Sequence, residues 1–247
     1  MEVTEHVTQL RVDGALMADA AAAVSPDAPI PTCPEWVMRD LVLHTGQVHR
    51  WATANVVNAS DTPADAAEAA GPSPSDAALV DWFRDGHEKL VDAIENAPAD
   101  LQCWTFMAAP SPLAFWARRQ CHETGMHRVD AQSASASITA FPDAVAADGI
   151  DELLCSFVTR PGGRLASDSL RTLQVLADDA DNAWLVKISD KVETERGPAT
   201  SADCTIRGRA SDLHLLLWNR TGRDSVAVDG DASLLDVWRD SVTIRWR

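Results

Sequence analysis

The pattern of apolar and polar positions predicts four long helices in the first 140 residues or so of the chain. Apolar residues recur there every three or four positions, which is the spacing of one helix face, and loops rich in proline, aspartate and alanine separate the segments. The expected helices run from about Glu5 to Ala23, from Thr32–Trp36 to about Ala59, from Ser75 to Ala97, and from Ser111–Pro112 to about Ala136. Four long helices joined by loops predict a helical bundle.

The pattern changes after Phe141–Pro142–Asp143. Short apolar runs separated by turn-forming residues predict strands at Leu170–Ala177, Ala183–Ile188, Cys204–Arg207 and Val226–Val228. Short helices are expected at Ile150–Thr159, Asp212–Trp218 and Ala232–Trp238. We therefore expect an α+β protein, with a four-helix bundle in residues 1–142 and a smaller α/β domain with a mainly antiparallel sheet in residues 143–247.

The composition narrows the class of partner. A formal charge of −16, with acidic residues spread along the chain, would repel the phosphate backbone of a nucleic acid. No apolar run approaches the roughly 20 residues of a membrane-spanning helix, and the N-terminal segment lacks the pattern of a signal peptide, so a cytoplasmic protein is expected.

The five cysteines are odd in number and widely spaced, which predicts free thiols rather than a disulfide framework. The chain has no tyrosine, so no phenol can serve it as a general acid.

Candidate chemistry lies on the fourth expected helix. Glu123 and His127 are four residues apart, so they share one helix face and can hold one metal ion, whereas His122 lies about 140° around the axis from His127. The pair belongs to a stripe of polar groups behind an aromatic residue: Trp116, Gln120, Glu123, His127 and Asp130. Such a stripe is usually a solvated face, and in that case Asp130 is an exposed acid. If the stripe is buried, Asp130 can accept a hydrogen bond from a histidine ligand.

The second expected helix contributes a candidate histidine. His44 lies on one stripe with Leu41, Val48 and Trp51, which predicts that His44 faces the core and that His49 points away from it. A single buried histidine is more often a hydrogen-bonded core residue than a metal ligand. The spacing of residues therefore leaves both interpretations open.

Three segments of the chain carry recognisable motifs. Residues 31–44 have the sequence PTCPEWVMRDLVLH, residues 115–131 have FWARRQCHETGMHRVDA, and residues 208–220 have GRASDLHLLLWNR. These segments resemble the mycothiol-dependent maleylpyruvate isomerase family, a branch of the DinB-like metal-binding bundles with a small sterol-carrier-like C-terminal domain. The resemblance implies one divalent metal ion, expected to be zinc, bound by His44, Glu123 and His127, with mycothiol as the thiol co-substrate. It also implies a functional arginine in the C-terminal domain, for which Arg220 is the candidate.

Other arginines are candidates for binding a carboxylate on the thiol or on the substrate, although helical arginines more often reach water or pair with acids. They lie on the fourth expected helix: Arg118, Arg119 and Arg128.

The implied ligand set predicts a type of chemistry. Two imidazoles and one carboxylate leave a coordination position open, which is the pattern of catalytic zinc, and a thiol bound there would lose its proton without help from a protein base. The expected function is therefore a metal- and thiol-dependent isomerase or S-transferase that acts on a small electrophile. The alternative is a bundle that keeps the metal ion and serves as a non-catalytic binding or regulatory module. The electrophile, the identity of the thiol and the oligomeric state stay open.

Overall fold

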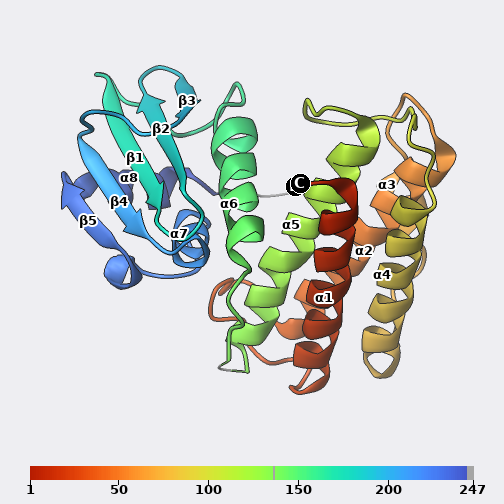
Figure 1. Ribbon diagram of the computed structural model, residues 1–247. Coiled ribbons are helices and arrows are strands. Elements are labelled where there is room, and N and C mark those ends of the chain that lie inside the picture. Colours follow the sequence, from red (N-terminus) through yellow and green to blue (C-terminus); the bar gives the residue numbers. More distant parts are fainter. Residues whose placement is uncertain (136, 244–247) are drawn as a thin grey trace. The chain divides into compact units, whose positions relative to one another are not determined.

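Four long helices form the first unit of the computed structural model, which describes residues 1–135 and 137–243. The helices are α1 (Val3–Ala22), α2 (Met38–Asn58), α4 (Leu79–Glu95) and α5 (Pro112–Ser133). They run side by side (Figure 1), and α1 and α2 each pack against both α4 and α5. The α2–α4 connection contains a short helix, α3 (Ala66–Ala70), and a single 3-10 turn (Asp76–Ala78). The expected four-helix bundle is confirmed, and the end predicted for the fourth helix, Ala136, lies outside the described residues.

The two helices that carry the candidate residues begin differently from one another. Helix α5 begins as predicted, because Ser111 Oγ accepts a hydrogen bond from Ala114 N at 3.1 Å and Pro112 is the first helical residue. The start predicted for the second helix, Thr32–Trp36, is wrong. The loop before α2 is closed by a β-bridge between Pro29 and Val37, so the helix begins only at Met38.

The core of the bundle has apolar residues towards both ends and polar residues across its middle. One apolar cluster joins the N-terminal halves of α1 and α5 to the C-terminal halves of α2 and α4, and a second cluster involves the opposite halves. Buried polar side chains lie between them: Asp13, Thr45, His49, Thr124 and Arg128. Glycines in three helices leave room for large side chains of a neighbouring helix: Gly14 for His87, Gly46 for Trp82 and Gly86 for Arg50.

Two histidines meet in this polar layer. The ring of His49 on α2 lies 5.3 Å from the ring of His87 on α4, and His49 Nε2 is 2.8 Å from Thr124 Oγ1 on α5. Burial lowers the pKa of both rings, because a charged imidazole loses its hydration inside the bundle. The positive charge of Arg11 on α1 adds to this effect at His87, whose pKa falls to about 4. Both rings are therefore neutral near pH 7.

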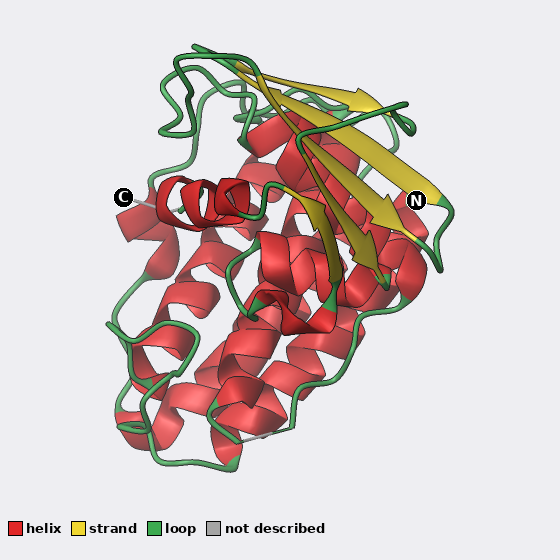
Figure 2. Cartoon of the chain, turned by 90° about the vertical axis from the view of Figure 1, so that its left-hand side faces the viewer, coloured by secondary structure: helices red, strands yellow, loops and turns green. Residues whose placement is uncertain are grey.

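The second unit contains a five-stranded sheet with helices packed beside it (Figure 2). It opens with α6 (Asp143–Glu152) and a π turn (Leu153–Phe157), and the other helices are α7 (Ala210–Leu217) and α8 (Ser233–Ser241), with a 3-10 turn at Arg223–Ser225. The strands are β1 (Arg171–Ala177), β2 (Asn182–Ile188), β3 (Val192–Arg196), β4 (Cys204–Gly208) and β5 (Ala227–Gly230). Their order is β3-β2-β1-β4-β5, and only β1 and β4 pair in parallel, so the mainly antiparallel sheet is confirmed.

The pairing register of β1 and β2 shows which side chains lie on the buried face of the sheet. Leu173 and Val175 of β1 lie opposite Val186 and Trp184 of β2, and all four side chains are buried. Helix α7 packs against β1 and β4, and Asn219, two residues after its end at Leu217, has a left-handed backbone conformation. No helix in the described part of the chain is both long and apolar enough to cross a membrane.

The neutral histidine pair predicts a loss of stability in acid. Both rings bind a proton more readily in the unfolded chain, where the pKa is 6.5, than in the folded protein, so lowering the pH from about 6.5 towards 4 favours unfolding. His87→Phe keeps a ring that can stack on Phe83 but removes one titrating group. The free energy of unfolding, measured with urea from about pH 7 to pH 4, should then fall less steeply than in the wild type, by up to about 3 kcal/mol over that range. Identical pH profiles would contradict this origin of the acid sensitivity.

Candidate metal centre

Three side chains from two helices converge within the bundle. Glu123 Oε1 on α5 lies 3.6 Å from His44 Nε2 on α2 and 3.3 Å from His127 Nε2 on α5. One potential ligand atom from each residue lies within 4.8 Å of the other two. Ligands bound to zinc at 2.0–2.2 Å in a tetrahedron are about 3.4 Å apart, so these atoms have the spacing that one small divalent ion requires.

The carboxylate of Glu123 is a buried anion with one oxygen free to bind a cation. Its Oε2 accepts a hydrogen bond from Arg119 Nη2 at 3.3 Å, whereas its Oε1 has no well-aligned hydrogen-bond donor within the described ranges. Burial by itself raises the pKa of Glu123, but the rings of His127 and His44 and the charge of Arg119 outweigh it and hold the pKa well below its usual range. A buried carboxylate oxygen without a donor is costly unless a cation lies beside it.

A chain of hydrogen bonds orients the ring of His127. Its Nδ1 lies 3.0 Å from Asp130 Oδ2, and Asp130 Oδ1 accepts a hydrogen bond from Thr32 Oγ1 at 2.7 Å. Asp130 is fully buried, so its interpretation as an exposed acid is wrong. A carboxylate that accepts from Nδ1–H leaves Nε2 as the metal-binding nitrogen, and Nε2 is the atom that faces Glu123.

The polar stripe of α5 is an interior surface and not a solvated face. Its five members are between 0% and 9% exposed: Trp116, Gln120, Glu123, His127 and Asp130. Periodicity alone did not decide this point, because the stripe is covered by residues that are distant in sequence. The sequence also offered no reason to assign a site role to Thr32. This residue lies in the loop before α2, far in sequence from Asp130, and only folding brings the two side chains together.

The predicted orientation of His49 is wrong. His49 is fully buried and contacts α5 and α4, whereas the side chain of His44 is 22% exposed. Helix α2 packs against both α4 and α5, so its buried face is wide and is centred on the side of His49. His44 therefore lies at the edge of the buried face, and it still reaches Glu123.

An aromatic side chain covers part of the candidate centre. The ring of Trp36, in the loop before α2, lies 4.9 Å from the ring of His44 and 6.0 Å from the ring of His127. Its half-buried position beside both imidazoles makes Trp36 a wall of the centre.

Two arginines of α5, Arg119 and Arg128, are hydrogen-bonded to buried acids. Arg119 is hydrogen-bonded to Glu123, and Arg128 Nε donates to Asp13 Oδ1 of α1 at 3.0 Å. Arg220 lies in the second unit after α7, where its Nη1 donates to the carbonyl oxygen of Trp218 at 2.8 Å.

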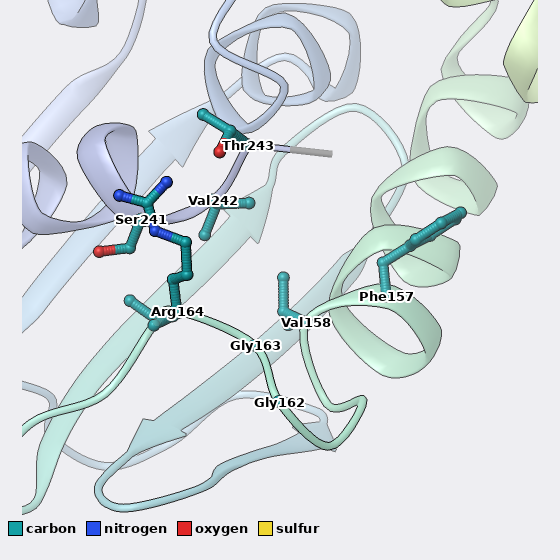
Figure 3. Close-up of a pocket in the computed structure, with 9 residues that line it drawn as sticks. Phe157, Val158, Gly162, Gly163, Arg164, Ser241, Val242 and Thr243 are labelled. Atoms are coloured by element: carbon teal, nitrogen blue, oxygen red, sulfur yellow. The ribbon is translucent and has the colours of Figure 1, made fainter. Parts of the chain in front are cut away.

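A cavity in the second unit lacks comparable chemistry. It measures about 240 Å³, below the usual 300–1,000 Å³ of small-molecule sites. Its lining is mostly apolar or glycine, and Arg164, Ser241 and Thr243 supply side-chain polar groups (Figure 3). The carboxylate and imidazoles of the bundle are the stronger candidate site.

Comparisons with known proteins match both halves of the chain. A family model described as the mycothiol maleylpyruvate isomerase N-terminal domain matches residues 7–132, and one described as the MDMPI C-terminal domain matches residues 144–236. Crystal structures of a mycothiol-dependent maleylpyruvate isomerase and of a point mutant of it give TM-scores of 0.64 and 0.63. Each is 14% identical and covers 92% of this chain and 93% of its own, which shows a shared fold. No match was found among curated proteins.

The candidate ligands predict which substitutions remove the metal ion. His44→Ala, Glu123→Gln and His127→Ala should each reduce bound metal to a small fraction of one equivalent, because each removes one of only three protein ligands. Elemental analysis after incubation with the metal and desalting measures this. Glu88→Gln, on the exposed side of α4, should keep the full equivalent. A full equivalent in any of the three ligand variants would show that the ligand set is wrong.

The hydrogen bond from His127 to Asp130 predicts a smaller effect. Asp130→Ala should weaken metal affinity roughly 10- to 100-fold, because the ring of His127 loses the acceptor that orients it. Thr32→Val removes only the outer hydrogen bond and should weaken affinity less. Competition with a chromophoric chelator measures both constants, and an unchanged affinity in Asp130→Ala would contradict the orienting role.

Proposed function

The chain belongs to the mycothiol maleylpyruvate isomerase family, and from that premise we propose that it is a metal-dependent enzyme with mycothiol as its thiol co-substrate. The observation that carries the proposal is the buried carboxylate of Glu123. One of its oxygens faces two imidazole nitrogens at the spacing of a catalytic metal site.

The donor set fits a catalytic ion. Two imidazoles and one carboxylate suit zinc, which we expect to be the metal, and three protein ligands leave a coordination position open. A divalent ion bound there would lower the pKa of an incoming thiol, so that the sulfur is available as thiolate at neutral pH. His44 is partly exposed, which gives that thiol a route to the centre.

The side chains around the ligands have positioning roles. Arg119 holds Glu123 Oε2 and so turns Oε1 towards the imidazoles, while Asp130 holds Nδ1 of His127. Trp36 covers one side of both imidazoles and limits the access of water there. The chain has no tyrosine, so no phenol shares in activating the thiol.

The proposed reaction joins the sulfur to an electrophilic carbon of a small substrate. The thiolate adds to one end of a carbon–carbon double bond, and the electron pair of that bond moves to the other end. In an isomerisation the adduct rotates about the former double bond, and the electron pair returns to expel the thiolate. In an S-transfer a proton from solvent quenches the electron pair, and the thioether is kept. We propose Arg220 as the residue that contacts a carboxylate of the substrate.

The remaining properties suit a small-molecule enzyme. A net charge of −16 disfavours nucleic acid as a partner. All five cysteines carry thiols and none forms a disulfide within the described residues, which fits a reducing compartment, and we propose that the enzyme works in the cytoplasm.

Cobalt-substituted protein tests the proposal directly. Addition of a thiol should produce a sulfur-to-metal charge-transfer band that grows with thiol occupancy, because the thiol binds at the open position. Mycothiol should saturate the band at a lower concentration than a small thiol, since its remote groups add binding energy. Removal of the metal should abolish mycothiol-dependent consumption of electrophiles. Stoichiometric cobalt protein that shows no spectral change with any thiol would rule out the thiolate mechanism.

A further inference from the structure

Gln120 is a buried amide whose oxygen lacks a partner. It lies on α5, its side chain is 1% exposed, and its Oε1 has no hydrogen-bond donor in the part of the chain that the structure describes. Buried amides are nearly always hydrogen-bonded, so an isolated amide oxygen indicates a partner such as water, an ion or a ligand.

The other buried glutamines of the described residues show how this chain uses a structural amide. Gln132 Oε1 accepts hydrogen bonds from Arg128 Nη1 at 3.1 Å and from Thr139 N at 2.9 Å. Gln174 Oε1 accepts from Ala199 N at 2.6 Å, and its Nε2 donates to the carbonyl oxygen of Trp184 at 2.9 Å. Gln120 differs from both, so a structural role does not account for it.

The position of Gln120 indicates what the missing partner is. Residues three and four apart share a helix face, so Gln120 lies one turn before Glu123 and one turn after Trp116 on the same stripe. On the facing helix, His44 contacts Glu123, and the ring of Trp51 lies 5.4 Å from that of Trp116. Gln120 is therefore placed between the candidate metal centre and an aromatic cluster around Trp116.

That cluster offers a partly exposed apolar surface about two helical turns along α5 from Glu123. Trp51 and Phe106 are half-buried, and their rings lie 5.4 Å and 6.3 Å from the ring of Trp116. A molecule bound at the metal and extending along the stripe would meet Gln120 first and the aromatic rings next.

We propose that Gln120 Oε1 accepts a hydrogen bond from an N–H or O–H group of the thiol co-substrate. This inference rests on the proposed function. The Cβ atoms of residues three apart on a helix are about 5–6 Å apart, so the donor must lie close to the sulfur. The recognised class is thiols with an amide N–H two carbons from the sulfur, and Gln120 is a specificity-determining residue for them.

A matched pair of thiols tests the hydrogen bond. N-acetylcysteamine and 2-mercaptoethyl acetate differ in that an ester oxygen replaces the amide N–H. Titrated into cobalt protein, the amide should bind more tightly than the ester, by roughly 3- to 10-fold for one neutral hydrogen bond. Gln120→Leu should bring this ratio close to one, whereas Gln47→Leu, on the exposed side of α2, should leave it unchanged.

The stability of the metal-free protein provides a second measurement. Gln120→Leu should raise Tm, because an apolar side chain replaces a buried polar group that has no partner. Gln132→Leu, on the same helix, should lower Tm because it removes an acceptor shared by Arg128 Nη1 and Thr139 N. Gln120→Met serves for both measurements if the leucine variant does not fold.

The outcomes separate this inference from the proposed function. If wild-type cobalt protein responds to thiols but Gln120→Leu keeps the full preference for the amide, the inference is overturned and the proposed function stands. A fall in Tm like that of Gln132→Leu would also overturn it, since Gln120 would then have a structural partner. If the wild type responds to no thiol, the proposed function is overturned. The inference that Gln120 binds the thiol is then overturned with it.

Discussion

The burial of one carboxylate, that of Glu123, constrains much of the first unit. A carboxylate inside a bundle is unfavourable unless positive charge and hydrogen-bond donors surround it. Arg119 binds one oxygen, and the other faces two imidazole nitrogens, so the carboxylate has a defined direction between α2 and α5. Asp130 and Thr32 extend this arrangement, because Asp130 Oδ2 lies beside Nδ1 of His127 and leaves Nε2 to face Glu123.

A bundle with polar groups at its middle must obtain its stability elsewhere. Apolar clusters towards both ends supply it, and the middle is arranged around polar side chains and glycines. Arg128 and Asp13 form a buried ion pair that joins α5 to α1, while His49 and Thr124 join α2 to α5. Each of these contacts specifies how one helix lies against another, which is the arrangement that a metal site built from two helices requires.

Secondary structure was predictable where it depends on local sequence. Helix α5 begins at its serine cap and proline, because those residues act within one turn of the chain. Helix α2 begins later than its motif suggested, because the bridge between Pro29 and Val37 holds the preceding loop. Strand β3 was missed, since its exposed, charged residues have no apolar alternation and it is defined by its pairing with β2.

The sequence by itself determined that Glu123 and His127 share a helix face, because a separation of four residues sets that geometry. Periodicity placed His44 on the core-facing side of its helix but predicted the wrong orientation for His49, and it was the family resemblance that implied a ligand role for His44. Only the tertiary structure decided that the stripe of α5 is buried, that Asp130 supports His127, and that Gln120 lacks a partner. The physical reason is that spacing along a helix is a local property, whereas burial and hydrogen-bond partners depend on which distant helices and loops pack against it.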